Sequence, residues 1–289
     1  MSKKLSIVAL AGMPNAGKST LTNLLVGQKI SIVTPKVQTT RFNTRGIVNL
    51  RETQIIFIDT PGLFKPKKPL EKQIVRSAWD GINEADIICF LIDPNSDFLE
   101  YLLTIKERVK NNNQICIAVI NKIDKLRDKK TLLPIMESLN QLSIFHSIFM
   151  ISALRGNGID NLLSFITQNA KEMPWLFKED EVTDKTEREI AEEVTRETLY
   201  MTLAEELPYS IEVKTEKWEE LDDGSAKIHQ VIHVLKESQK NIIVGKQGAK
   251  IKEVGSKSRV KISNILDRPI HLFLYVKVKE DWIEKQCLL

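Results

Sequence analysis

The fold of this chain is decided by the stretch Gly12-Met13-Pro14-Asn15-Ala16-Gly17-Lys18-Ser19, which Thr20 follows directly. The stretch fits the pattern GxxxxGK[ST], in which the glycines let backbone amides turn inward around phosphate oxygens. An apolar run at 5–11 precedes it and an amphipathic run at 18–26 follows it. This order of predicted strand, loop and predicted helix indicates a phosphate-binding loop at the end of an α/β sheet.

Within this loop each polar side chain has an expected role. Lys18 should reach the β- and γ-phosphates of a nucleotide, and the Ser19 hydroxyl should bind Mg²⁺. The amino end of the predicted helix adds a positive dipole end beside the phosphates. Asn15 has two readings that the sequence leaves open: it helps to coordinate a monovalent cation such as K⁺ near the phosphates, or it only stabilises the loop.

A second motif, Asp59-Thr60-Pro61-Gly62, comes at the end of another apolar run. The Asp59 carboxylate can hold Mg²⁺ through a water, and the Gly62 amide can contact the γ-phosphate. Ras-like switches carry a glutamine next, and it orients the attacking water. Here that residue is Leu63, which cannot do so. We therefore expect slow unaided turnover that relies on backbone groups, another side chain or a bound cation.

Two further motifs predict that the base is guanine. In Asn121-Lys122-Ile123-Asp124 the Asp124 carboxylate can accept hydrogen bonds from the N1–H and the exocyclic amine of guanine, a donor pair that adenine lacks. Lys122 can lie against the base plane, and Asn121 can tie this loop to the phosphate loop. A backbone amide of Ser152-Ala153-Leu154 can meet guanine O6.

The segment between the first predicted helix and the run at 45–50 should contain a threonine that binds Mg²⁺. We expect this residue to be Thr40, with Thr39 as the second choice. Together with Lys18 and Gly62, Thr40 then completes the predicted catalytic set, and the predicted metal ligands are Ser19, Thr40 and Asp59.

Apolar runs alternate with amphipathic stretches through about the first 170 residues. The runs are apolar on both faces, which is typical of buried parallel strands, and they predict a doubly wound, mostly parallel six-stranded sheet of the Ras-like P-loop type. The run at 45–50 should pair antiparallel with the strand at 54–58 as a hairpin. The expected strands are 5–11, 55–59, 87–93, 115–121 and 148–152, and the helices include 18–26, 70–83 and 99–110.

The alternation stops near Met173, and three parts result: a nucleotide-binding domain at 1–172, a linker at 173–183 and a second domain at 184–289. The second domain reads as a helix, two strands, two helices and a strand, the α-β-β-α-α-β order of a type II KH domain. The helix is expected at 186–206, the strands at 210–218, 226–235 and 270–278.

A GxxG turn joins the two later helices of the second domain. Gly245, Lys246, Gln247 and Gly248 form it, and Lys250 follows. KH domains use such a loop to clamp the backbone of single-stranded nucleic acid, although an ordinary corner between two helices has the same pattern. Residues 236–261 carry a net charge of +6 in a domain whose residues 180–289 sum to −4. This segment has no aromatic residue, so base stacking would have to come from elsewhere.

Composition excludes several other classes of protein. The net charge is +4 in 289 residues, no apolar run approaches the length of a membrane span, and Cys89, Cys116 and Cys287 form no CxxC pair. A disulfide framework and a zinc site are therefore not expected, and a reducing cytosol is the natural compartment.

These motifs, together with Gln38-Thr39-Thr40-Arg41 and the KH unit, closely resemble those of the Era family of bacterial GTPases over nearly the whole chain. Leu63 fits that family, whose members carry an apolar residue there. The resemblance implies GTP hydrolysis and binding of the 3′ end of 16S ribosomal RNA during assembly of the 30S subunit, with no role for DNA. It also implies a cytoplasmic monomer, and some members associate peripherally with the inner membrane.

Two alternatives from other classes remain open. The chain could be a constitutive RNA-binding protein whose nucleotide domain is only structural, although intact Lys18, Ser19 and Asp59 speak against this. It could also be a P-loop kinase, although the guanine motif speaks against that. Competition for a labelled nucleotide by GTP but not ATP would decide the second case.

Overall fold

The computed structural model of the chain describes residues 3–36, 39–110, 114–203 and 211–279. Two compact units result from its contacts. The first comprises residues 1–31 and 40–184, and the second comprises residues 32–39 and 185–289. The second unit thus takes in a short segment from early in the chain, which the sequence did not indicate.

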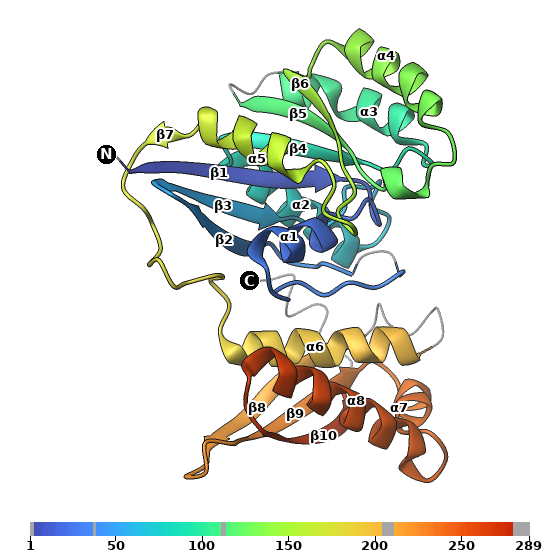
Figure 1. Ribbon diagram of the computed structural model, residues 1–289. Coiled ribbons are helices and arrows are strands. Elements are labelled where there is room, and N and C mark those ends of the chain that lie inside the picture. The colour runs from blue at the N-terminus through green and yellow to red at the C-terminus, as the bar shows by residue number, and fades with distance from the viewer. Residues whose placement is uncertain (1–2, 37–38, 111–113, 204–210, 280–289) are drawn as a thin grey trace. The chain divides into compact units, whose positions relative to one another are not determined.

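The described part of the first unit contains one seven-stranded sheet with the order β2-β3-β1-β4-β5-β6 and a short strand β7 beside β1 (Figure 1). The hairpin of β2 and β3 is antiparallel, as predicted, and β3, β1, β4, β5 and β6 run parallel. The strands are β1 (Lys4–Gly12), β2 (Thr44–Leu50), β3 (Thr53–Asp59), β4 (Ile87–Ile92), β5 (Ile115–Ile120), β6 (Ser147–Met150) and β7 (Lys171–Glu172).

Strand β7 adds a short piece to the predicted six-stranded sheet. β4 pairs with β1 only from Val8 onward, which leaves the first residues of β1 without a neighbour on that side. Lys171 and Glu172 fill this place by pairing with Leu5 and Lys4. A two-residue strand has no periodicity to read, so no pattern in the sequence predicts it.

Helices cover both faces of this sheet. On one face, α1 (Lys18–Val26) and α5 (Ile159–Gln168) pack through Leu21, Leu162 and Ile166. On the other face lie α2 (Pro69–Glu84), α3 (Phe98–Lys110) and α4 (Leu132–Leu142), which are joined by the apolar side chains of β1, β4 and β5. The arrangement places the carboxyl ends of the parallel strands at one edge, where open α/β sheets bind ligands.

The second unit has the predicted order of elements. Its helices cover one face of a three-stranded sheet with the order β10-β9-β8, in which β9 and β10 are parallel (Figure 1). The elements are α6 (Glu187–Thr202), β8 (Glu212–Glu220), β9 (Ala226–Val234), α7 (Glu237–Val244), α8 (Ala249–Leu266) and β10 (Ile270–Val278).

Helix α6 begins and ends differently from its prediction. Thr186 and Glu189 form a reciprocal capping box, which fixes the start at Glu187. The chain turns extended at Leu203, so the helix ends at Thr202 rather than at 206. Residues 204–206 of the predicted helix and Ser210 of the predicted strand lie outside the described residues.

The segment predicted as a linker is grouped with the first unit. Trp175 donates its indole N–H to the carbonyl of Glu52, and Gln54 binds the backbone of residues 176 and 177. Further on, the amide of Ile47 donates to the carbonyl of Val182. These hydrogen bonds tie the segment to the β2–β3 hairpin.

Candidate functional site

The phosphate loop leaves β1 and enters α1 through two glycines in unusual conformations. Gly12 has φ 139° and Gly17 has φ 99°, both in the region that side chains rarely adopt. A Cβ on Gly17 would lie 2.3 Å from Nδ2 of Asn121. The loop thus closes around a space too tight for any larger residue at this position.

Lys18 points back into the loop that precedes it. Its Nζ donates to the carbonyl oxygens of Gly12 (3.2 Å) and Met13 (3.0 Å), and only 6% of the residue is exposed. Burial lowers the pKa of Lys18 to about 8, with Asp59 offsetting part of this effect and Lys122 adding to it. An anion in the loop would stabilise the charged form of this amine.

The lowered pKa of Lys18 predicts that nucleotide binding is accompanied by uptake of a proton. At pH 8 about half of Lys18 is neutral before binding, and a bound diphosphate raises its pKa, so binding of GDP should take up about half a proton. Affinity should then fall as the pH rises above 8. Calorimetry in two buffers of different ionisation enthalpy measures the uptake directly.

The pH dependence of proton uptake tests whether Lys18 is the group that takes up the proton. At pH 6.5 Lys18 is already charged, so the same experiment should show almost no uptake at this residue. Equal proton uptake at both pH values, or none at pH 8, would contradict the lowered pKa.

Two hydroxyl groups meet between α1 and the segment after it, and the Asp59 carboxylate at the end of β3 lies close enough to Lys18 to raise the pKa of that amine. The hydroxyls of Ser19 and Thr40 lie 3.0 Å apart, and Asp59 is fully buried at the end of β3. Hydroxyl and carboxylate oxygens are ligands that Mg²⁺ prefers, so the donor set fits this ion. Thr39 instead bonds with its hydroxyl to Thr34 and to the carbonyl of Lys36. The geometry therefore favours Thr40, the first choice from sequence.

No group of three or more His, Cys, Asp or Glu side chains suited to a metal occurs among the described residues. The predicted Mg²⁺ ligands Ser19, Thr40 and Asp59 differ from such a group, because two of them are hydroxyls.

The loop after β3 lies close against the phosphate loop. A Cβ on Gly62 would come within 2.8 Å of three atoms of Pro14, and the amide of Leu63 donates to the carbonyl of Gly12 (3.0 Å). The Leu63 side chain is 1% exposed and packs in the apolar core. Thr60 is also buried and donates to the carbonyl of Leu10. Leu63 is thus a core residue, and the described geometry gives it no access to a water beside phosphate.

Asn121 connects three loops with one side chain. Its amide nitrogen donates to the carbonyl of Ala16 (2.9 Å), and its amide oxygen accepts from the backbone N–H of Ala153 (2.9 Å). The bond to Ala16 is the tie to the phosphate loop that was expected for Asn121, and the bond to Ala153 adds the third loop, which was not expected.

Asp124 and Lys122 are each oriented by a neighbour. The Ser152 hydroxyl donates to Oδ1 of Asp124 (2.6 Å), which fixes the carboxylate predicted to read guanine. Lys122 Nζ donates to Oδ2 of Asp93 (2.8 Å) and to the carbonyl of Asn15. Burial alone would raise the pKa of Asp93, but hydrogen bonds from Lys122 and Asn95 hold it below its usual value.

Asp93 was missed in the sequence reading. It follows β4, so it belongs to the same strand-end edge as Asp59 and Asn121. This position at a strand end is the feature of the sequence that could have marked Asp93 as a site residue.

In the second unit, the GxxG turn joins α7 to α8. Gly245 and Gly248 have φ values of 72° and 78°, and Gln247 between them has φ 51°. A Cβ on Gly245 would lie 2.7 Å from the Cβ of Lys250. Both glycines are thus needed for the shape of the turn, which lets a ligand approach the backbone.

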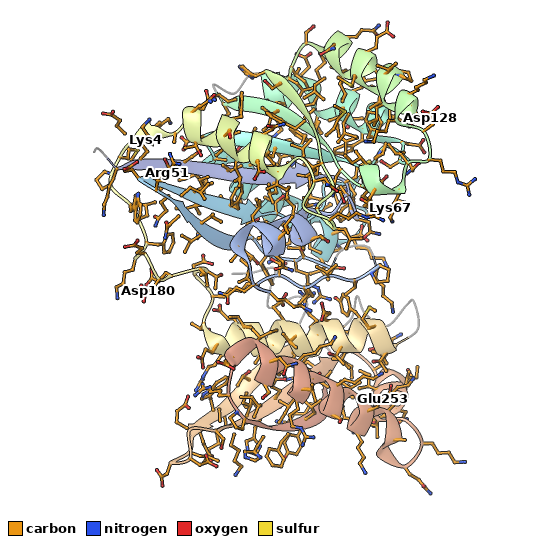
Figure 2. The ribbon with its side chains drawn as sticks, viewed as in Figure 1. Lys4, Arg51, Lys67, Asp128, Asp180 and Glu253 are labelled. Atoms are coloured by element: carbon orange, nitrogen blue, oxygen red, sulfur yellow. The ribbon has the colours of Figure 1, made fainter. Side chains whose placement is uncertain are left out.

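Next to this turn runs a groove of about 370 Å³ between α8 and β10, the edge strand of the sheet. Its cations are Lys252 and Arg259, which the sequence reading did not assign to a site. Glu253, the acidic residue beside them, pairs with Lys257 (2.6 Å), and Figure 2 shows it on α8. The lining residues are Ile251, Lys252, Gly255, Ser256, Arg259, Leu272, Phe273 and Leu274.

Of the described residues 32–36 and 39, which belong to the second unit, Val33 and Thr39 bond to α6. Buried Glu197 accepts the N–H of Val33 (3.0 Å) and pairs with Lys261 of α8 (3.1 Å). Buried Arg196 donates to the carbonyl of Thr39 (2.7 Å). This segment ends where Thr40, the predicted metal ligand, begins.

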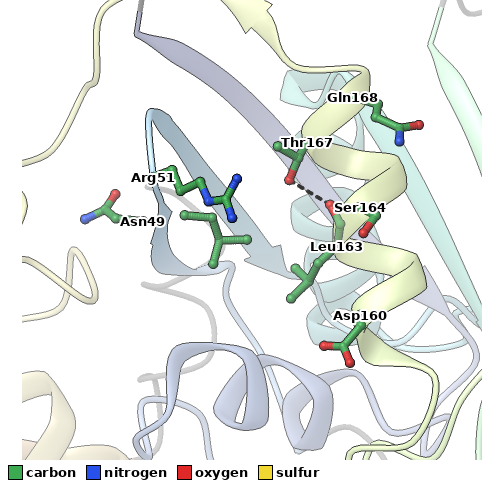
Figure 3. A pocket seen from close by; sticks show the side chains of 8 residues that line it. Asn49, Arg51, Asp160, Leu163, Ser164, Thr167 and Gln168 are labelled. Atoms are coloured by element: carbon green, nitrogen blue, oxygen red, sulfur yellow. Dashed lines mark hydrogen bonds between the residues drawn. The ribbon is translucent and has the colours of Figure 1, made fainter. Parts of the chain in front are cut away.

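The first unit has a hollow of about 570 Å³ between the β2–β3 turn and α5 (Figure 3). None of the predicted nucleotide-site residues lines it. Its lining residues are Asn49, Leu50, Arg51, Asp160, Leu163, Ser164, Thr167 and Gln168.

Among the described residues, no helix combines the length and the apolar character needed to cross a membrane.

Comparisons with known proteins agree with this geometry. Residues 7–122 match the family model for a 50S ribosome-binding GTPase, and residues 206–283 match that for a KH domain. The class is therefore a P-loop GTPase with a C-terminal KH domain.

Within that class the chain belongs to the Era family of GTPases. It is 48% identical to GTPase Era of Rickettsia conorii over 285 residues, 99% of this chain and 84% of that protein. With GTPase Era of Brucella suis it shares 47% identity over 275 residues, 95% of this chain and 88% of that protein.

Solved structures give the same result. The fold superposes on Era in complex with MgGDPNP and nucleotides 1506–1542 of 16S ribosomal RNA with a TM-score of 0.91, at 39% identity, covering 98% of this chain and 96% of that one. A variant of Aquifex aeolicus Era bound to GDP and aluminium fluoride gives a TM-score of 0.90 at the same identity and the same coverage.

Proposed function

We propose that this protein is a GTP-hydrolysing switch that binds the 3′ end of 16S ribosomal RNA and assists assembly of the 30S subunit. The observation that carries the proposal is the presence of two complete sites in one chain. One is the strand-end edge with Lys18 and Asp124, and the other is the groove beside Gly245 and Gly248. The solved Era complex with a 16S RNA fragment supports the identity of the RNA.

In this proposal the first unit binds GTP and assists its hydrolysis. Lys18 and the backbone of the loop neutralise the phosphates, and the Gly62 amide contacts the γ-phosphate. Mg²⁺ held by Ser19, Thr40 and Asp59 would offset the charge that develops between the β- and γ-phosphates. Leu63 stands where Ras-like switches carry glutamine, and it cannot orient the attacking water. Intrinsic GTP hydrolysis is therefore slow.

The second unit binds single-stranded RNA. The GxxG turn lets phosphates approach the backbone, while Lys246 and Lys250 at the turn and Lys252 and Arg259 in the groove supply positive charge. The apolar wall of the groove accommodates unstacked bases.

The test is the affinity for an oligomer of the 16S 3′ end, measured with GDP and with a non-hydrolysable GTP analogue. A switch requires different affinities in the two states. Equal affinities would favour the alternative, a constitutive RNA-binding protein with a structural nucleotide domain. Absence of RNA binding in both states would refute the RNA assignment altogether.

Asn15 is the proposed contact to a monovalent cation. Its φ of 62° and the hydrogen bond from Lys122 to its carbonyl show a fixed loop position beside the predicted phosphate site. If K⁺ binds there, Asn15→Ala should reduce turnover about tenfold and abolish its stimulation by K⁺ over Na⁺, since one ligand of a cation near the transition state is lost. Steady-state hydrolysis in the two salts measures this, and unchanged K⁺ dependence would leave Asn15 as a structural residue.

Location and assembly state complete the proposal. The family resemblance and the ribosomal partner support a cytoplasmic monomer that associates peripherally with the inner membrane in part. Cell fractionation and sedimentation test these points separately.

A further inference from the structure

The GxxG segment contains no aromatic residue, yet single-stranded RNA is commonly held by stacking of bases on aromatic rings. Rings are found instead on the face of the three-stranded sheet that the described helices do not cover. Along β10, Ile270, Leu272 and Leu274 pack toward the helices, and the residues between them point the other way. Phe273 and Tyr275 on this outer face are 43% and 51% exposed.

These rings form an ordered cluster with a histidine of β9. His229 is the register partner of Phe273, and their rings stack at 4.9 Å with an angle of 13° between planes. The Tyr275 ring lies 6.2 Å from His229 on a plane only 7° away. We refer to Phe273, Tyr275 and His229 as the ring cluster. Its rings are parallel, so a base entering beside them meets aligned surfaces.

Two lysines flank the ring cluster, and one glutamate lies between them. Lys227 Nζ lies 5.8 Å from the centre of the Phe273 ring, and Lys217 is the register partner of His229. Glu219, the acidic residue opposite Lys227, is paired with both lysines. Rings flanked by lysines suit a base with its phosphate. A protein partner would require a larger apolar area than two exposed aromatic side chains among charged neighbours provide.

The ring cluster is continuous with the groove. Phe273 lines the groove between α8 and β10 and also belongs to the cluster, because β10 is the edge strand. We propose that RNA leaving the groove passes over the edge of β10 and stacks an unpaired base on the ring cluster. This inference rests on the proposed RNA-binding function and extends its footprint beyond the groove.

Two RNA oligomers of different length test the inference. A GxxG groove clamps about four nucleotides, so a four-nucleotide oligomer of the 16S 3′ end should occupy the groove alone, whereas a ten-nucleotide oligomer should reach the ring cluster. Tyr275→Ala should weaken the long oligomer about five- to a hundredfold and leave the short one unchanged within about twofold. Tyr275→Phe keeps the ring and should retain affinity.

A base analogue locates the contact directly. With 2-aminopurine placed successively along the long oligomer, a position beyond the fourth should be quenched by the wild-type chain and by Tyr275→Phe, but not by Tyr275→Ala. The inference is overturned if Tyr275→Ala binds both oligomers like the wild type, or weakens both equally. It is also overturned if photocrosslinking during subunit assembly joins the β10 segment to a protein instead of RNA. If the wild-type chain binds neither oligomer, the proposed RNA function itself fails.

Discussion

Asp124→Asn should lower the affinity for GTP and GDP by about 10²- to 10⁴-fold. The variant replaces two acceptor oxygens by one acceptor and one donor, so one of the two charge-assisted hydrogen bonds to guanine is lost and the new N–H faces the exocyclic amine. The hydroxyl of Ser152 fixes the side chain at this position, which leaves it little freedom to turn away. Fluorescence titration with labelled nucleotides measures the loss.

The same variant should prefer a different base. Xanthine carries a carbonyl where guanine carries its amine, and the new amide can donate to this oxygen while it accepts from N1–H. Asp124→Asn should therefore bind xanthosine diphosphate at least about tenfold more tightly than the wild type does. Asp128→Asn, which only caps the neighbouring turn, is the matched control and should change neither affinity. Unaltered GTP affinity in Asp124→Asn would mean that another group reads the base.

Gly245→Asp combined with Gly248→Asp should weaken binding of the 16S 3′ end about 10²-fold or more. A Cβ at Gly245 meets Lys250, and both positions have positive φ, so the turn must change its shape. Two carboxylates would also repel the phosphates that this turn should clamp. Fluorescence anisotropy with labelled RNA measures affinity, and crosslinking to cellular RNA shows whether a ribosomal footprint is lost.

Controls separate loss of the clamp from loss of the fold. Gly224→Asp places one carboxylate in a turn between β8 and β9 that also has a positive φ of 80°, but where a Cβ meets no atom within 4 Å. It should keep RNA affinity within about threefold. Gly248→Asp alone is the milder variant, since its Cβ meets only Ile251 at 4.0 Å. GTP binding should be normal in all three variants, and an unchanged footprint in the double variant would remove the GxxG turn from the RNA site.

Residues whose role depends on backbone shape were predictable from the sequence. Gly12, Gly17 and Lys18 come in a fixed spacing between a strand and a helix, and a fixed spacing at such a junction permits few conformations. The same holds for Asp59 and Asn121, because parallel strands bring their carboxyl ends to one edge. The hydrogen bond of Asn121 to Ala16 agrees with the expected tie.

The partners of residues that act through distant neighbours were not predictable. Asp93 acquires its role only because Lys122 reaches it across the strand-end edge. Phe273 and His229 are 44 positions apart in sequence and meet because β9 and β10 pair in one particular register. The bonds of Val33 to Glu197 and of Thr39 to Arg196 likewise depend on tertiary packing, and so short a segment carries no periodic signal.

The peptide bond between Thr39 and Thr40 connects the two units. Thr39 is grouped with the second unit through Arg196, whereas Thr40 is grouped with the first and faces Ser19. Because the peptide bond is planar, a displacement of either residue has to be accommodated by the φ and ψ angles on its two sides. Linkage is reciprocal: if GTP changes RNA affinity by some factor, RNA must change GTP affinity by the same factor. Ribosomal RNA would then change the affinity of this chain for GTP. A thermodynamic cycle of GTP binding with and without RNA measures the size of that change.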